Sequence, residues 1–197
     1  MTAKSDILTN VRRAGVPATE RPTLDRAWTT YADRRAQFAQ VLESVGGRAV
    51  FVGGISDVEA DLRVQATYQT ASRVCDTLTP RGLGNVDLGT IADPHELADI
   101  DLAIVRGELA VAENAAVWVD DKNLRHRAVL FLTQHLALVV RQADLLDNLH
   151  QAYDCLNFDA AGYGVFISGP SKTADIEQSL VIGAHGPRSL VVYLTEE

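Results

Sequence analysis

From residue 48 onward the chain consists of short apolar runs separated by polar and helical stretches. The runs are four or five residues long, do not alternate with polar residues, and cover 49–52, 102–105, 136–140, 164–167 and 190–194. Such runs are typical of strands buried on both faces, as in a parallel sheet covered by helices. Helix signals lie between them, at 56–66 and 143–156. The pattern predicts an α/β fold with a mostly parallel sheet.

The N-terminal part follows a different pattern. Apolar residues recur at helical spacing in 7–11 and again in 31–45, on either side of a stretch at 15–22 that is rich in helix-breaking residues. We therefore expect an N-terminal helical arm over 1–47 that packs on the main body, and an α/β domain over 48–197.

One segment departs from the strand-and-helix rhythm. Two apolar stretches within 108–119 flank a turn at Glu113 and Asn114, which predicts a hairpin inside or beside the parallel sheet. A glutamate held on a rigid hairpin is a candidate nucleophile or general base. An asparagine-containing turn is also explained by backbone geometry alone.

The loop after the fourth apolar run is the most informative for chemistry. Gly169, Ser171, Lys172 and Thr173 lie just before an apolar periodicity that predicts a helix over 174–184. A helix N-terminus offers free N–H groups and the positive end of the dipole, so a carboxylate or phosphate can bind there. We expect this loop at the carboxyl ends of the strands, where ligands bind in open α/β sheets. A plain helix cap with a solvated lysine explains the same residues.

Four further residues extend this candidate anion site. Glu177 lies at the margin of the apolar stripe of the predicted helix, where a carboxylate needs a cationic or hydrogen-bonding partner. Lys172, His185 and Arg188 are the nearest candidates in the sequence. Asp175 is an acidic residue in the first helical turn, where it interacts favourably with the dipole. A structural ion pair explains Glu177 more simply than a catalytic role does.

Composition excludes several classes of protein. The 197 residues suit about one domain. The net charge of −8 argues against a nucleic-acid partner, because a phosphate backbone is bound by neutralising it. No apolar run approaches the roughly 20 residues that span a bilayer, and residues 1–10 lack the apolar block of a secretory signal. We therefore expect a cytoplasmic protein without membrane insertion.

Cysteines and histidines give no sign of a metal centre. Cys75 and Cys155 stand far apart with no CxxC pattern, and the five histidines have no metal-ligand spacing. We expect neither a metal site nor a cofactor on this chain.

Two neighbouring stretches carry a specific resemblance to a known family. The sequence SGPSKTADIEQ at 168–178, followed by VIGAHGPRSL at 181–190, closely resembles the C-terminal signature of the LUD-domain family, in its lactate-utilisation protein C group. A weaker likeness runs back through 105–119 and 138–153. The resemblance implies a fold similar to the sugar-phosphate isomerase and CoA-transferase superfamily, a three-layer α/β sheet.

The same resemblance implies a function. Members of this group act in the oxidation of L-lactate to pyruvate, as one component of a three-protein system whose other members carry iron-sulfur clusters. Iron-sulfur proteins are then the expected partners, and a small organic anion is the expected ligand. The loop from Gly169 to Thr173, together with Asn114, would hold the anion, with Glu113 facing it. Whether the chain forms a homo-oligomer is left open.

The hairpin turn departs from the family pattern. Many members have a Glu-Thr-Gly-Thr sequence where this chain has Glu113, Asn114, Ala115 and Ala116. The Glu-Asn pair is similar to the Ser-Glu-Asn-Gly loop of class I CoA-transferases, whose glutamate forms an acyl-CoA thioester. Alanine at position 115 is strained if that position requires a positive φ. The likeness of the Glu-Asn pair makes acyl transfer through Glu113 one alternative function. A non-catalytic scaffold subunit is the other.

Overall fold

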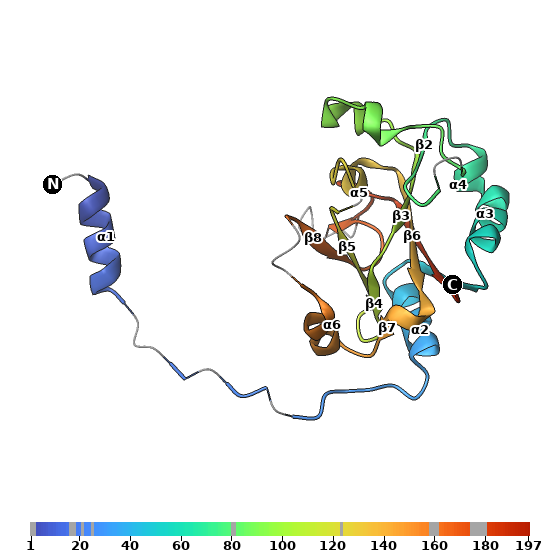
Figure 1. Ribbon diagram of the computed structural model, residues 1–197. Helices are drawn as coiled ribbons and strands as arrows, with labels where there is room; N and C mark the ends of the chain where they lie inside the picture. Colours follow the sequence, from blue (N-terminus) through green and yellow to red (C-terminus); the bar gives the residue numbers. More distant parts are fainter. Residues whose placement is uncertain are drawn as a thin grey trace.

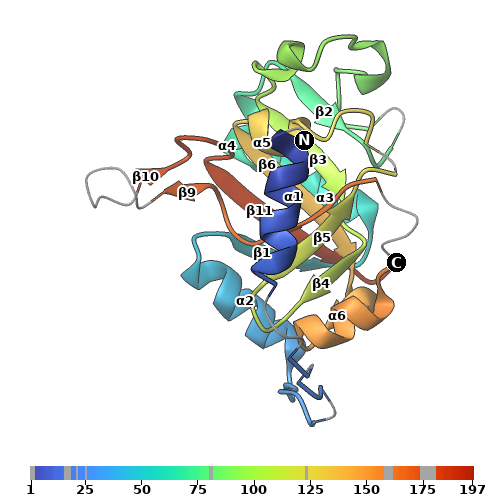
Figure 2. The same ribbon diagram turned by 90° about the vertical axis from the view of Figure 1, so that its left-hand side faces the viewer.

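The computed structural model describes residues 3–15, 19–20, 22–24, 26–79, 82–122, 124–157, 162–173 and 181–197. Its centre is a five-stranded sheet in the order β1-β11-β6-β3-β2, and every pairing in it is parallel (Figures 1 and 2). The strands are β1 (Arg48–Val52), β2 (Val74–Asp76), β3 (Leu102–Arg106), β6 (His135–Arg141) and β11 (Ser189–Thr195). Four of the five apolar runs lie in these strands, which confirms the mostly parallel sheet.

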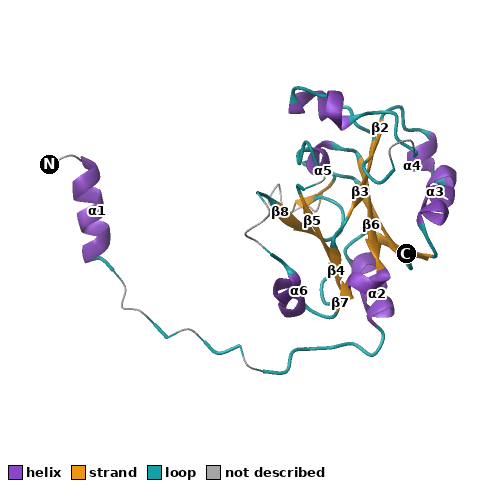
Figure 3. Cartoon of the chain, in the orientation of Figure 1, coloured by secondary structure: helices purple, strands orange, loops and turns teal. Residues whose placement is uncertain are grey.

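The fifth apolar run lies in a second, smaller sheet of order β7-β4-β5-β8. Its strands are β4 (Leu109–Val111), β5 (Ala116–Asp120), β7 (Leu145–Leu146) and β8 (Gly164–Ile167). β4 and β5 form the predicted antiparallel hairpin, and β8 runs antiparallel to β5. Residues 145–146, which were expected within a helix, are strand β7 and pair with β4. Figure 3 shows this sheet packed beside the large one.

The described residues also form helices, most of which pack against the two sheets. They are α1 (Ala3–Arg13), α2 (Arg34–Ser44), α3 (Ile55–Val64), α4 (Ala66–Gln69), α5 (Val129–Leu132) and α6 (Leu149–Cys155), with 3₁₀ turns η1 (Leu88–Thr90), η2 (Pro94–Leu97) and η3 (Gln142–Asp144). Within the described residues, none of these helices combines the length and the apolar character that crossing a membrane requires.

The main hydrophobic core lies between the two sheets. It contains Leu138 of β6 and Val117 of β5, together with Phe38 and Leu42 of α2. The opposite face of the large sheet packs against α3 and α4, and α6 packs on the outer face of the smaller sheet. One face of the parallel sheet is thus covered by another sheet, where helices alone were expected.

The two helices of the N-terminal segment differ in their packing. Asp33 caps α2 by accepting a hydrogen bond from the Ala36 N–H at 2.9 Å, and Phe38 and Leu42 on successive turns are fully buried. By contrast, α1 buries no residue and lies clear of the body (Figure 1). The expected packing of the arm is therefore met by α2 and not by α1.

A short two-stranded hairpin projects from the body, made by β9 (Lys172–Thr173) and β10 (Val181–Ile182) (Figure 2). It follows β8 in the chain and precedes β11, so it carries the stretch that the sequence singles out for anion binding.

Candidate functional site

The two signature segments come together as a β-ribbon. β9 and β10 pair antiparallel, with Lys172 opposite Ile182. The ribbon continues through two backbone hydrogen bonds, because the Gly183 N–H donates to the Ser171 oxygen and the Ser171 N–H donates to the Pro187 oxygen, each at 2.9 Å. The predicted loop therefore lies alongside the segment that carries the candidate histidine and arginine.

The helix predicted over 174–184 is wrong in its second half. Residues 181–182 form a strand, and Gly183 has a φ of +77°, which is incompatible with a continuing helix. Both residues of β10 are β-branched and suit a strand, so pairing overrode the helical apolar spacing. Asp175 and Glu177 lie outside the described residues. The predicted helix N-terminus, at about 174, also lies outside the described residues, so the site is described from the side chains of the ribbon.

The loop lies at the amino ends of the parallel strands, and its predicted place at their carboxyl ends is wrong. A Cβ atom on Gly169 would lie 2.7 Å from the backbone oxygen of Val45, just after α2. The Arg188 N–H donates to the Gln134 oxygen at 2.8 Å, immediately before β6. The strand before the loop, β8, is antiparallel within the smaller sheet, so the rule for parallel strands does not determine where it ends.

A cavity of about 280 Å³ opens beside the ribbon. Ser168, Ser171, Lys172 and His185 provide its polar lining, and Gly169 contributes backbone. Its apolar wall comes from α5 and β8, with Leu136 near the start of β6 and Leu190 near the start of β11. A concave site with apolar walls and a few convergent polar groups is the usual form of a small-molecule site. The structure thus gathers four of the predicted residues around one cavity.

Two other predicted residues of the ribbon, Thr173 and Arg188, do not line this cavity in the described part of the chain. Arg188 lies instead near the start of β6. Burial lowers the pKa of His135, and the Arg188 guanidinium lowers it further. The His135 Nδ1 lies 2.8 Å from the Ser189 Oγ on the adjacent strand. The charge of Arg188 therefore acts on the neighbouring edge of the large sheet.

Glu113 lies at the exposed tip of the β4–β5 hairpin and faces α6. Its Oε2 accepts a hydrogen bond from the Leu149 N–H at 3.0 Å, and its own N–H donates to the Asp147 oxygen at 3.0 Å. The glutamate thus satisfies a free N–H at the start of α6. Within the described residues, Glu113 is not part of the cavity wall.

Asn114, the next residue, connects the hairpin to the loop. The Ser168 Oγ donates to the Asn114 backbone oxygen at 2.7 Å, and the Asn114 Oδ1 accepts from the Ala116 N–H at 3.2 Å. The Asn114 side chain therefore shapes the turn, and its backbone holds the first residue of the cavity loop. The hairpin tip and the loop are therefore neighbours, and this contact is made by the backbone of Asn114.

The backbone at Ala115 is in the left-handed region, with φ +51° and a fully buried side chain. Ala115 is alone in this among the non-glycine residues that the structure describes. The strain considered from the sequence is therefore present. Strained backbone of this kind clusters at functional sites.

Two features near the site had no counterpart in the sequence prediction. Leu130 and Phe131 of α5 line the cavity, and their only signal is the short apolar run 129–132. A larger cavity of about 460 Å³ lies on the outer side of the smaller sheet, beside Trp118 and Lys122, and none of the described candidate residues lines it.

No three His, Cys, Asp or Glu side chains of the described part gather as a metal site.

Comparison with protein families matches residues 30–195 to the family described as the LUD domain. Lactate utilization protein C 1 of Bacillus mycoides (strain KBAB4) is 34% identical over 93 residues, which are 44% of this chain and 40% of that protein. Lactate utilization protein C of Geobacillus kaustophilus (strain HTA426) is 31% identical over 101 residues, or 48% and 41%. The chain thus spans about two fifths of the length of these relatives.

A further relative and a solved structure cover more of the chain. The uncharacterized protein YkgG of Escherichia coli (strain K12) is 30% identical over 181 residues, which are 88% of this chain and 74% of that protein. The crystal structure of a DUF162 family protein from Deinococcus radiodurans superimposes with a TM-score of 0.63, at 14% identity, over 82% of this chain and 96% of that one. The latter likeness confirms the fold.

Proposed function

Because the chain belongs to the LUD domain family, we propose that it takes part in the utilization of lactate. The names of its relatives support this role. We propose more specifically that it is one component of the oxidation of L-lactate to pyruvate, as the resemblance of its signature to the lactate-utilisation protein C group implies.

The observation that carries the proposal is the cavity beside the ribbon. A small 2-hydroxy or 2-oxo acid has a carboxylate, a polar group on the next carbon and a methyl group. The Lys172 ammonium suits the carboxylate, because hydrogen bonds between ionised partners are the stronger ones. Ser171 or His185 can bond the polar group, and the apolar wall of α5 and β8 accepts the methyl group.

The oxidation itself releases two protons, which pass to the solvent, and two electrons, which need an acceptor. We assign the acceptor to iron-sulfur proteins that act with this chain. The ligand-binding component then holds the organic acid, and the redox centres lie on its partners.

Growth on L-lactate as sole carbon source tests the role. Deletion of the gene should abolish growth, and the unaltered gene should restore it. A gene with Lys172→Gln should fail to restore growth, whereas Lys4→Gln, a matched change of a lysine on α1, should succeed. Unimpaired growth of the deletion strain would contradict the proposal, provided no second copy of the gene is present.

One observation favours a second candidate, acyl transfer through Glu113. The strained φ of Ala115 follows the Glu-Asn pair at the position of the glycine in the CoA-transferase loop. In that reaction the Glu113 carboxylate takes the CoA thiol from an acyl-CoA as a thioester, and the acyl group leaves as a free carboxylate. Mass spectrometry after incubation with acyl-CoA should then show a CoA adduct that Glu113→Ala removes and Glu108→Ala, a change at the base of the same hairpin, retains.

A non-catalytic scaffold predicts no small ligand at all. Thermal unfolding in the presence of L-lactate, pyruvate and acyl-CoA separates it from both other candidates. A ligand at 100 times its dissociation constant stabilises the folded state by about 2.7 kcal/mol, which is readily measured.

A further inference from the structure

The cavity of about 460 Å³ on the outer side of the smaller sheet lies at the carboxyl ends of two parallel strands. β3 ends at Arg106, and Glu108 of the cavity wall follows closely in the chain. β6 ends at Arg141, and Ala143 of the wall follows in the same way. In open α/β sheets, ligands bind outside the carboxyl ends of the strands. The cavity therefore lies where this type of fold favours a ligand.

One part of the cavity wall is apolar. It comes from Leu109 and Trp118, which pair across β4 and β5, from Leu146 of β7, and from Leu156 after α6. The Trp118 ring packs against Phe166 in a tilted arrangement, with the ring centroids 4.8 Å apart. Aromatic rings pack well on one another in such arrangements, so this wall suits the apolar, and preferably aromatic, part of a ligand.

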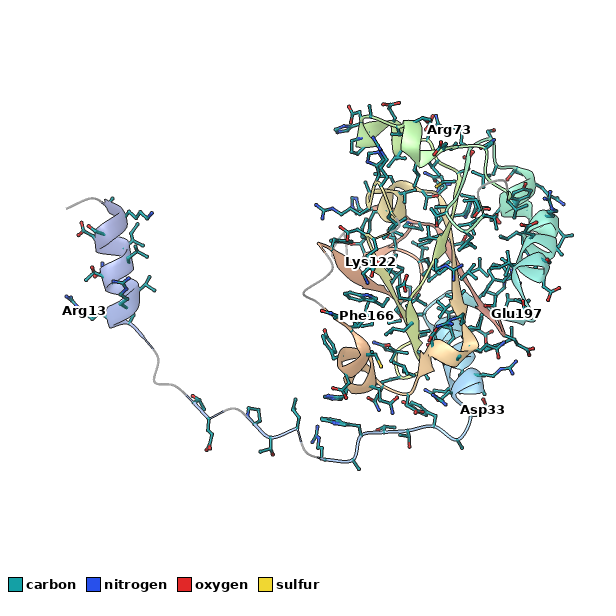
Figure 4. The ribbon with its side chains drawn as sticks, viewed as in Figure 1. Arg13, Asp33, Arg73, Lys122, Phe166 and Glu197 are labelled. Carbon is teal, nitrogen blue, oxygen red and sulfur yellow. The ribbon has the colours of Figure 1, made fainter. Side chains whose placement is uncertain are left out.

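A lysine in the wall can bind an anionic group. The Lys122 Nζ lies 2.8 Å from the Oδ2 of Asp120, whose side chain is only 4% exposed, and the Asp120 Oδ1 accepts a hydrogen bond from the Lys122 N–H at 3.1 Å. Figure 4 shows Lys122 on the side of the body that the smaller sheet forms. An ammonium group has three donors, so Lys122 keeps two of them for a ligand while Asp120 holds it in place.

Glu108 offers the opposite charge. Among the described residues its carboxylate has neither a hydrogen-bond nor an ion-pair partner, whereas Asp144 of the same wall accepts a hydrogen bond from the Arg141 Nε at 2.7 Å. Asp120 raises the pKa of Lys122, and Glu108 raises it further. The Glu108 carboxylate therefore lies close enough to Lys122 to act on its charge, and it remains available to a cationic group.

The two charges together select the class of ligand. Lys122 would repel a molecule that carries only a cation, and Glu108 would repel one that carries only an anion. A molecule with both charges finds a partner for each, and the apolar wall accepts the rest of it. We propose that this cavity binds a zwitterionic amino acid with an aromatic side chain, its ammonium at Glu108, its carboxylate at Lys122 and its ring beside Trp118. The cavity shares no described wall residue with the one beside the ribbon, so the proposal is independent of the role in lactate utilization.

Titration with L-phenylalanine, followed by the fluorescence of Trp118, tests the proposal. The full chain has two tryptophans, and Trp28→Phe leaves Trp118 as the only one while keeping an aromatic ring beside His150. L-phenylalanine should change the emission saturably. Phenylpropanoate, which lacks the ammonium, and phenylethylamine, which lacks the carboxylate, should each bind about tenfold more weakly or worse, as loss of a charged hydrogen bond requires.

Two substitutions in the same chain assign the two charges. Glu108→Gln should lower the affinity for L-phenylalanine about tenfold without weakening phenylpropanoate, and Lys122→Gln should do so without weakening phenylethylamine. Glu43→Gln, a matched change on α2, should leave the affinity for L-phenylalanine unchanged. Circular dichroism checks that the variants fold.

The exposed thiol of Cys155 gives a second measure of occupancy, because it also lines the cavity. Bound L-phenylalanine should slow its reaction with Ellman's reagent severalfold. The proposal is overturned if L-phenylalanine changes neither the Trp118 fluorescence nor the Cys155 reaction, if phenylethylamine or phenylpropanoate binds as tightly, or if Glu108→Gln and Lys122→Gln keep full affinity.

Discussion

Replacing Gly169 by alanine tests whether the candidate site depends on how the loop that contains Gly169 packs against Val45, the residue after α2. Gly169 has φ +74°, and a Cβ atom there would lie 2.7 Å from the Val45 backbone oxygen and 3.0 Å from its Cγ2. Gly46 also has a positive φ, of +84°, but a Cβ there would meet nothing closer than 3.5 Å. The two substitutions share the conformational strain, and only Gly169→Ala adds a collision with Val45.

The expected loss of unfolding free energy in each variant follows from these two contributions, the backbone strain and the collision. A non-glycine residue in the left-handed region costs about 1–2 kcal/mol, and alanine recovers about 0.4–1 kcal/mol by restricting the unfolded chain. Gly46→Ala should therefore cost about 1 kcal/mol. Gly169→Ala must also displace a backbone oxygen and should cost about 1–3 kcal/mol more, as overpacking does. Both variants should still fold, since domains are stable by about 5–15 kcal/mol.

Urea unfolding measures both costs from the midpoint and slope of each transition. The affinity of the same samples for pyruvate should also fall in Gly169→Ala, because the displaced loop carries Ser171 and Lys172. Gly46→Ala should bind as the unaltered chain does. Equal unfolding midpoints for the two variants would refute the packing argument.

The remaining predictions concern buried groups and the strained turn. Burial and the Asp61 carboxylate raise the pKa of Tyr193, so the folded state should lose stability as the pH rises above 10.0, the ordinary value. Tyr193→Phe should reduce that alkaline loss. It should also lower the unfolding free energy by about 1.5–3 kcal/mol at neutral pH, because it removes the hydroxyl that donates to Asp61 at 2.6 Å. Urea unfolding at neutral pH and at a pH above the ordinary value of tyrosine checks both effects. Burial raises the pKa of Cys75 to about 12, whereas Cys155 is exposed, so Ellman's reagent should titrate one thiol in the folded chain, two after unfolding, and none in folded Cys155→Ser. Ala115→Gly relieves the positive φ but loses a buried methyl group, so its unfolding free energy should change by less than about 1 kcal/mol, and a larger loss would show that the turn is not strained.

Strand assignments could be made from the sequence because burial leaves a direct mark on composition. The runs at 102–105 and 136–140 are apolar throughout, since β3 and β6 are covered on both faces. The hairpin around Glu113 was equally visible. The run at 164–167 carried no sign that it belongs to another sheet, because pairing partners and direction depend on contacts between distant parts of the chain.

The candidate site was predicted in part. The structure brings Ser171, Lys172 and His185 together around one cavity, and their binding of an anion stays a prediction. The apolar wall from α5 was missed, since four apolar residues do not reveal what they face. Helical spacing at 181–184 was misleading, because the same residues also suit a strand followed by a turn. Val181 and Ile182 are β-branched, and Gly183 adopts a positive φ.

Calorimetric titration of the full chain with pyruvate and with L-lactate tests the central claim most directly. The account predicts saturable binding of at least one of these acids at one site per chain. It also predicts that Lys172→Gln lowers the affinity about tenfold or more, as loss of a charged hydrogen bond does, while Lys4→Gln leaves it unchanged. Absence of binding by the unaltered chain, or equal affinity in Lys172→Gln, would contradict the claim.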